Sequence, residues 1–124
     1  MTDTPPPPVL HLRLIFPDRA MFGPGKGELL ALIRDTGSIS AAGRQMGMSY
    51  KRAWSLVEEM NTACRSPLVE SARGGAGGGG ARLTEVGMQA LAAYQALVEA
   101  ARSAGAPHIA TLEALLAPDM SAGK

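Results

Sequence analysis

The spacing of apolar residues predicts a strand and then a helix in the first third of the chain. Between residues 10 and 16, leucine and phenylalanine alternate with other side chains, which indicates a strand with one buried face. Pro17 and Asp18 end this strand in a turn. A glycine-rich loop over residues 23–27 leads into a helix that carries leucine and isoleucine side chains between 29 and 33. Gly37 lies just past the end of this helix, where a left-handed capping residue is expected.

Two further helices are predicted close together after this cap. The second helix begins at Ser38 or Ser40, since either serine is a good N-cap, and it stops after two turns at Gly47. Ser49 caps a third helix, which runs to about Asn61. The glycine allows the sharp turn between the two helices.

The third helix has two distinct faces. One stripe is predicted to face the core, and it consists of Tyr50, Ala53, Trp54, Val57 and Met60. A second stripe is basic or small and faces away from the core: Met48, Lys51, Arg52 and Ser55. Trp54 is expected in the core because it shares its stripe with Val57 and Met60. For Tyr50, in the first turn, contact with a phosphate or a thymine methyl is as well supported as a place in the core.

The second half of the chain predicts a glycine-rich hairpin and a long helix. Residues 68–72 and 81–83 indicate two strands, and the segment 74–80 between them holds six glycines. The longest helix starts at Thr84–Glu85 and runs to about Arg102. Gly105 to Pro107 breaks it, and a last short helix follows. Four residues repeat at a 3-4-3 spacing, which is typical of a narrow seam between two packed helices: Leu91, Tyr94, Val98 and Ala101.

The 124 residues are enough for one domain. We expect a disordered Pro-rich tail over 1–9, one domain over 10–105, and a short helix with a frayed tail over 106–124. Neither a targeting signal nor an apolar run of about 18 residues is found, which predicts a cytoplasmic protein.

Charge is distributed unevenly along a nearly neutral chain. Twelve lysines and arginines against eleven acidic residues give a net charge of +1, which excludes a histone-like polycation. Between residues 34 and 82, however, seven basic residues stand against four acidic ones, and a polyanion would bind in this basic middle. The single cysteine and two distant histidines exclude an intrachain disulfide and argue against a metal site.

A helix, a short helix, a glycine turn and a helix with a basic face form the pattern of a helix-turn-helix. In such motifs the second helix of the pair lies in the major groove of DNA. The hairpin that follows predicts a winged variant: a mostly α-helical fold with a small β-wing and a long C-terminal helix. Direct readout of bases is assigned to Ser49, Tyr50, Lys51, Arg52 and Ser55. Contacts to the DNA backbone are assigned to Ser38, Ser40, Arg44 and the wing residues Arg73 and Arg82. The alternative is a helical bundle whose helices only pack against each other.

No pattern supports catalysis. Gly75, Gly77 and Gly80 satisfy G-x-G-x-x-G, but the residues that follow look extended, whereas a dinucleotide site needs a helix there. No grouping of serine, histidine and carboxylate is found. We therefore expect neither enzymatic activity nor a cofactor or metal.

Three stretches, Gly37–Ala42, Ser49–Trp54 and Glu59–Asn61, together resemble the DNA-binding domain of ModE-type molybdate-responsive regulators. Leu68–Glu70, the glycine run and Leu83–Thr84 with Gly87 continue the resemblance, which covers about residues 10 to 105. The broader LysR-type domain shares the serine-rich second helix but lacks this wing.

The resemblance implies a winged helix-turn-helix that dimerises through its long helices. The predicted dimerisation residues are therefore those of the seam: Leu91, Tyr94, Val98 and Ala101. It also implies a palindromic operator in double-stranded DNA near molybdenum-related genes, with Lys51, Arg52 and their neighbours facing the DNA. Full-length members carry a further molybdate-binding region, so we expect either a stand-alone DNA-binding form or a separate molybdate-sensing protein. An interaction module that depends on such a sensor and binds DNA only weakly is the alternative function.

Overall fold

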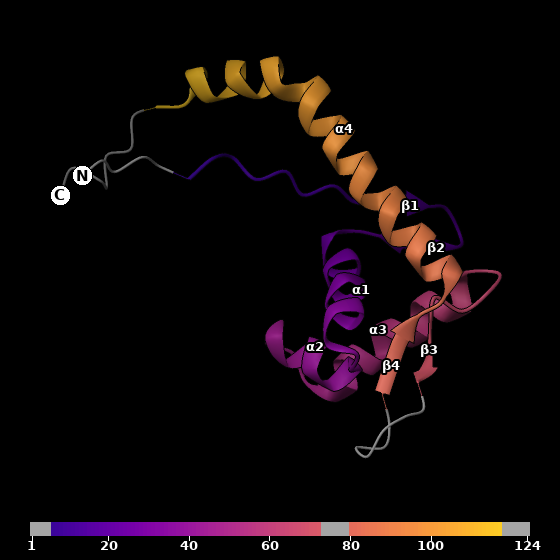
Figure 1. Ribbon diagram of the computed structural model, residues 1–124. Helices are drawn as coiled ribbons and strands as arrows, with labels where there is room; N and C mark the ends of the chain where they lie inside the picture. Colours follow the sequence, from indigo (N-terminus) through magenta and orange to yellow (C-terminus); the bar gives the residue numbers. More distant parts are fainter. Residues whose placement is uncertain (1–5, 73–79, 118–124) are drawn as a thin grey trace.

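Four helices and two separate two-stranded antiparallel sheets make up the residues that the computed structural model describes, which are 6–72 and 80–117. Helices α1 to α3 cluster together beside the hairpin of β3 and β4, and α4 leads away from this cluster (Figure 1). The elements in chain order are β1 (Leu14–Phe16), β2 (Ala20–Phe22), α1 (Pro24–Thr36), α2 (Ile39–Gln45), α3 (Tyr50–Ala63), β3 (Val69–Ala72), β4 (Gly80–Leu83) and α4 (Glu85–Leu115). The predicted mostly helical fold with a small wing is confirmed.

Local capping signals set the boundaries of the first three helices. Gly37 adopts a left-handed conformation with φ of 73° after α1, as predicted. The side chain of Ser38 accepts a hydrogen bond from the Ala41 amide at 3.0 Å, and that of Ser49 accepts one from the Arg52 amide at 3.1 Å. Each bond satisfies a backbone donor at a helix start that has no partner within the helix. Gly47, with φ of 74°, makes the turn between α2 and α3.

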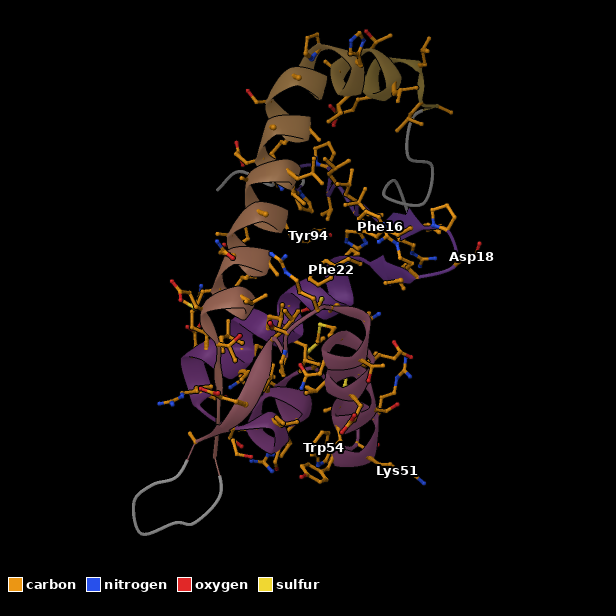
Figure 2. The ribbon with its side chains drawn as sticks, turned by 90° about the vertical axis from the view of Figure 1, so that its right-hand side faces the viewer. Phe16, Asp18, Phe22, Lys51, Trp54 and Tyr94 are labelled. Carbon is orange, nitrogen blue, oxygen red and sulfur yellow. The ribbon has the colours of Figure 1, made fainter. Side chains whose placement is uncertain are left out.

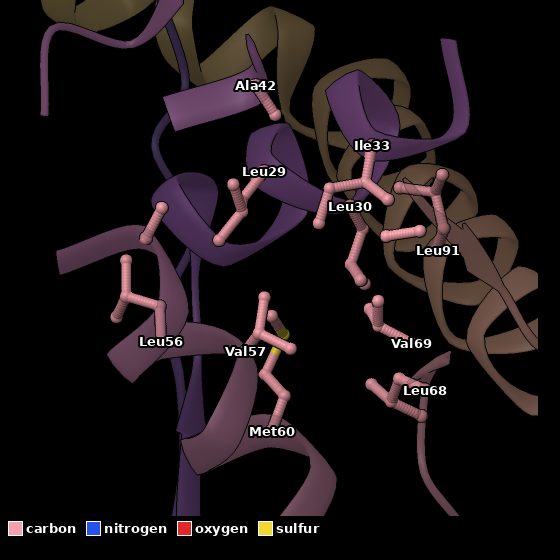
Figure 3. Close-up of a cluster of buried hydrophobic side chains, with 12 residues drawn as sticks. Leu29, Leu30, Ile33, Ala42, Leu56, Val57, Met60, Leu68, Val69 and Leu91 are labelled. Carbon is pink, nitrogen blue, oxygen red and sulfur yellow. The ribbon is translucent and has the colours of Figure 1, made fainter. Parts of the chain in front are cut away.

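One hydrophobic core joins the three-helix cluster to the wing and to the start of α4 (Figure 3). Leu29, Leu30 and Ile33 of α1 are completely buried at its centre. Each fully buried side chain of this size contributes about 1.5–3 kcal/mol to folding. The rest of the core consists of Ala42, Ala53, Leu56, Val57, Met60, Leu68, Val69, Ala81 and Leu91.

The N-terminal strand differs from its prediction. Only Leu14–Phe16 is a strand, and it pairs with a second strand, Ala20–Phe22, which the sequence pattern did not indicate. All three residues of β1 are exposed, so the predicted buried face is wrong. The physical reason is that this hairpin lies beside the core, and of its six strand residues only Phe22 packs against it.

The glycine-rich segment before the first helix belongs largely to the helix itself. Helix α1 begins at Pro24, so the loop predicted over 23–27 is wrong. Proline suits the first turn of a helix, where its missing N–H is not needed. A side chain at Gly27 would place its Cβ 2.9 Å from the ring of Tyr94, so this glycine serves the contact between α1 and α4.

Helix α4 continues past its predicted end. It includes Gly105 and Pro107 and ends only at Leu115, so the predicted break and the separate last helix are wrong. Pro107 lacks the N–H that would bond to the preceding turn, which favours a kink over an interruption. The last part of α4 bends away from the axis of the first part (Figure 1). The domain boundary expected at residue 105 therefore falls inside a helix.

The wing strands pair as the sequence indicates. Strands β3 and β4 are antiparallel, with Val69 opposite Leu83 and Glu70 opposite Arg82. The Ala81 amide donates to the Gly37 carbonyl at 2.9 Å, which ties the wing to the turn between α1 and α2. The glycine-rich tip, residues 73–79, lies outside the described residues.

Candidate nucleic-acid interface

Helices α2 and α3 form a tight helix-turn-helix. A side chain at Gly43 would bring its Cβ within 2.8 Å of the Ala53 Cβ, so a glycine is needed where the two helices cross. The Met48 amide donates to the Gly43 carbonyl at 2.9 Å and fixes the turn. The orientation of α3 relative to α2 is therefore set by backbone contact.

The first turns of α3 present the predicted base-reading residues to solvent. Lys51, Arg52 and Ser55 are exposed, and Lys51 projects from the lower end of the molecule in Figure 2. Ser49 accepts the capping hydrogen bond with one lone pair of its hydroxyl oxygen, so its O–H and a second lone pair remain for a ligand. Tyr50 is 53% exposed and faces solvent.

Trp54 is the residue that the sequence pattern placed wrongly. It was expected in the core, but 37% of it is exposed, and it lies close to Lys51 in Figure 2. A hollow of about 260 Å³ separates the N-terminal ends of α2 and α3 from the base of the wing, and Trp54 lines it together with Tyr50 and Ser71. The indole is exposed because this hollow lies beside it, whereas Val57, one helical turn on, belongs to the core.

Acidic residues occupy the second half of α3. Glu58 and Glu59 are both exposed, and Glu59 forms an ion pair with Lys26 of α1 at 3.1 Å. The positive charges of α3 are therefore confined to its first turn, at Lys51 and Arg52. Such a helix attracts a polyanion at its N-terminal end and repels it at its C-terminal end.

The residues at and after the start of α2 that are expected to contact the DNA backbone are partly or fully exposed. Ser38 caps α2, and Ser40 accepts a hydrogen bond from Arg44 Nη1 at 3.4 Å. Arg44 is exposed one helical turn after Ser40. This bond leaves the other guanidinium donors of Arg44 available to phosphate.

The wing provides one described arginine, and it is paired. Arg82 Nε donates to Glu70 Oε2 at 2.8 Å, between residues that are directly opposite in the sheet. This pair is exposed and therefore weak, so phosphate can compete for the guanidinium. Arg73 lies outside the described residues.

Asn61 connects α3 to the wing, a role that the sequence reasoning missed. Its Oδ1 accepts from the amides of Leu68 and Val69 at 2.8 and 3.1 Å, and its Nδ2 donates to the Val69 carbonyl at 3.0 Å. The side chain thus hydrogen-bonds to the start of β3 as a neighbouring strand would. Its only sequence signal is a polar residue in the last turn of a helix, just before a strand.

Two of the four predicted dimerisation residues pack within the protomer. Leu91 is 3% exposed and belongs to the core, so its assignment to a seam between two chains is wrong. Tyr94 donates from its hydroxyl to the Leu12 carbonyl at 2.6 Å and packs edge-on against Phe22, with 5.1 Å between ring centroids. Burial raises the pKa of this hydroxyl. Val98 and Ala101 are partly exposed.

The remaining features of the described residues concern metal-binding groups, membrane-spanning helices and the cysteine. Among residues 6–72 and 80–117, no three side chains of the metal-binding types lie together. Within the same ranges, no helix combines the length and the apolar character needed to cross a membrane. Cys64 is a free, exposed thiol.

Comparison with known proteins assigns this geometry to a family. Residues 27–88, from α1 to the first turn of α4, match the model of the bacterial regulatory helix-turn-helix proteins of the lysR family. These residues are half of the chain and include all of α2, α3 and the wing. The family consists of DNA-binding regulators and not of enzymes.

Individual proteins with similar sequences are regulators or binding proteins connected with molybdenum or transcription by name. The molybdenum-pterin-binding protein MopB of Rhodobacter capsulatus is 50% identical over 78 residues, 63% of this chain and 29% of that protein. The transcriptional regulator ModE of Yersinia pestis is 43% identical over 86 residues, 69% of this chain and 33% of that protein.

The DNA-binding transcriptional dual regulator ModE of Escherichia coli K12 is 43% identical over 76 residues, 61% of this chain and 29% of that protein. This chain thus spans a third or less of the length of the curated relatives it matches. The chain belongs to the lysR family of bacterial regulatory helix-turn-helix proteins.

Proposed function

We propose that this chain binds DNA sequence-specifically as part of a transcriptional regulator of molybdenum-related genes. The observation that carries the proposal is the exposed pair Lys51 and Arg52 in the first turn of α3, directly after the turn of the helix-turn-helix. Their position supports insertion of this end of α3 into the major groove. The names of the relatives MopB and ModE support the connection to molybdenum.

The charge distribution along α3 defines how the helix docks. Lys51 and Arg52 can donate to the O6 and N7 atoms of guanine, which is the commonest specific contact in the major groove. The carboxylates of Glu58 and Glu59 are repelled by phosphates, so the second half of α3 stays out of the groove. The helix therefore enters end-on, with its N-terminus leading.

The aromatic residues add apolar contacts next to the basic ones. Tyr50 and Trp54 lie one helical turn apart, and both are substantially exposed. Thymine carries a methyl group in the major groove that apolar side chains recognise. We assign contacts with thymine methyl groups or deoxyribose to these two side chains.

Contacts to the DNA backbone come from both sides of α3. Arg44, with Ser38 and Ser40, serves one flank, and the wing serves the other. Arg82 contributes when phosphate replaces Glu70 as its partner, and Arg73 remains an expected contact. These contacts fix the position of α3 but do not read sequence.

We further propose that the operator is palindromic and that the chain binds it as a homodimer. Leu91 and Tyr94 already pack within the protomer. We therefore propose that the dimer contact is formed by apolar residues of α4 that remain at least partly exposed, including Leu97, Val98 and Ala101. Two copies would place their α3 helices in half-sites about 34–36 Å apart. A regulator of this kind binds the chromosome, so we propose that it is cytoplasmic. We also propose that a separate protein senses molybdate.

The test is selection of bound sequences from random DNA, followed by titration of the selected site. Lys51→Ala and Arg52→Ala should each weaken binding to that site by about 1–3 kcal/mol, which is roughly 5- to 150-fold, if the residue contacts a base. Thr62→Ala is the matched control, because Thr62 is exposed on the same helix but near its C-terminal end.

Two results would contradict the proposal. In one, the Lys51/Arg52 double variant retains its preference for the selected site over random DNA. In the other, the unmodified chain binds all sequences equally and only at low salt, as expected of an interaction module with incidental DNA binding.

A further inference from the structure

A cavity of about 250 Å³ lies between the β1–β2 hairpin, the first turn of α1 and the last turn of α3. Its walls are mostly apolar, and they are formed by Phe16, Met21, Phe22, Met60, Ala63 and Leu68. Phe16 and Phe22 lie far from Lys51 and Trp54, at the other end of the cluster in Figure 2. The cavity is thus separate from the proposed DNA-binding surface.

One wall of this cavity contains a buried ammonium group. Lys26 is 9% exposed, and its Nζ donates to the Met21 carbonyl at 2.9 Å and pairs with Glu59 at 3.1 Å. An ammonium has three N–H donors, so these two partners leave one donor without an acceptor. A buried cation is stabilised by every further acceptor that it gains.

A second cation stands at the same cavity. Arg19 lines it and forms no ion pair among the described residues. No aspartate or glutamate belongs to the lining. Glu59 lies outside the lining but balances the charge of Lys26, so Arg19 leaves one net positive charge at the cavity. This charge favours an anion, while the remaining walls favour an apolar body. A DNA backbone cannot enter, because the cavity is too small and too apolar for a duplex.

We propose that this cavity binds a small carboxylate with an apolar body, such as a single ring or a branched chain. The carboxylate would accept from the free N–H of Lys26 and from Arg19, and the ring would contact Phe22 and Met60. Pockets for drug-sized ligands measure about 300–1,000 Å³, so this smaller cavity suits a ligand with one ring. The inference goes beyond DNA binding and does not depend on it.

Calorimetry and amide chemical shifts with phenylacetate test this site directly. Phenylacetate should bind saturably and shift the amides of Phe22, Met60 and Ala63. Acetate, which lacks the ring, and phenylacetamide, which lacks the charge, should each bind at least about tenfold more weakly. Equal affinity for phenylacetate and phenylacetamide would overturn the proposal, as would the absence of saturation at millimolar concentrations.

Substitutions of Arg19 and Lys26 test whether these cations bind the carboxylate of phenylacetate. Arg19→Ala, at an exposed position, should weaken phenylacetate binding about tenfold and leave phenylacetamide binding unchanged. Arg65→Ala is the matched control, because Arg65 is exposed nearby but does not line the cavity. Lys26→Met should abolish the preference for the anion, with circular dichroism confirming the fold. If it does not fold, Arg19→Ala alone decides, and unchanged phenylacetate affinity in that variant refutes the site.

Discussion

Replacing Asn61 with leucine should destabilise the domain more than any exposed substitution on α3. The change keeps the size of the side chain but removes both of its polar atoms. Three hydrogen bonds of 2.8, 3.0 and 3.1 Å are lost, and two belong to the backbone of Val69, which is 4% exposed. Each such bond contributes about 0.5–1.5 kcal/mol net, so we expect a loss of about 2–4 kcal/mol.

A second variant separates the accepting and donating roles of this side chain. Asn61→Asp keeps an oxygen that accepts from the amides of Leu68 and Val69, but it cannot donate to the Val69 carbonyl. Its second oxygen would instead face the Val69 carbonyl oxygen, and two acceptors repel each other, so Asn61→Asp should also lose stability. Thr62→Ala is the control, because Thr62 is exposed in the same turn and surface substitutions change stability by less than about 0.5 kcal/mol.

Urea unfolding followed by circular dichroism and by the fluorescence of Trp54, the single tryptophan, measures all three variants. We expect the midpoints of Asn61→Asp and Asn61→Leu to lie below those of the unmodified chain and Thr62→Ala. If the midpoint of Asn61→Leu equals that of Thr62→Ala, the hydrogen bonds between α3 and the wing contribute nothing, and the reasoning is refuted.

Three further substitutions test packing and titration. Gly87→Ala should lower the unfolding temperature by an amount equivalent to about 1–3 kcal/mol, because its methyl group would overlap the Leu68 carbonyl. Gly25→Ala is the control: the space around Gly25 is open, so this change should be neutral or stabilising. Leu91→Asp should abolish the folded circular dichroism signal, because it buries an unpaired carboxylate in the core. If the Leu91→Asp chain is instead folded and monomeric, Leu91 belongs to a dimer seam after all. The raised pKa of Tyr94 stabilises the fold below a pH of about 10, and this contribution is lost as pH rises through the raised value. Tyr94→Phe should therefore flatten the alkaline loss of stability in urea titrations.

The helix-turn-helix could be predicted from the sequence because its determinants are local. Ser38 and Ser49 cap their helices through amides three residues away, and Gly37 ends α1 through its own backbone conformation. Such interactions do not depend on the rest of the fold. The basic first turn of α3 is equally local, since residues 51 and 52 follow directly from the cap.

The parts that were predicted wrongly depend on contacts between distant segments. Leu91 fits a seam between two helices by spacing alone, but its surface is used by the protomer's own core. Trp54 fits a core stripe, yet whether a wing strand covers it is decided outside α3. Lys26 sits in what the sequence suggested as a loop, and its burial results from the hairpin and from Glu59. Periodicity describes one element at a time and cannot contain this information.

The hydrogen bond between Ala81 and Gly37 has a consequence for how relatives of this chain can be recombined. Gly37 closes α1, opens the turn into α2 and holds β4 through its carbonyl, and a side chain at Gly80 would lie only 3.1 Å from that same oxygen. If α2 and α3 of a relative were transplanted into this chain together with the turn before them, the new turn would not match the hydrogen bond that β4 makes to Gly37. Chimeras should exchange α1 through β4 as one unit, and diversification of operator preference is confined to side chains that this junction leaves free.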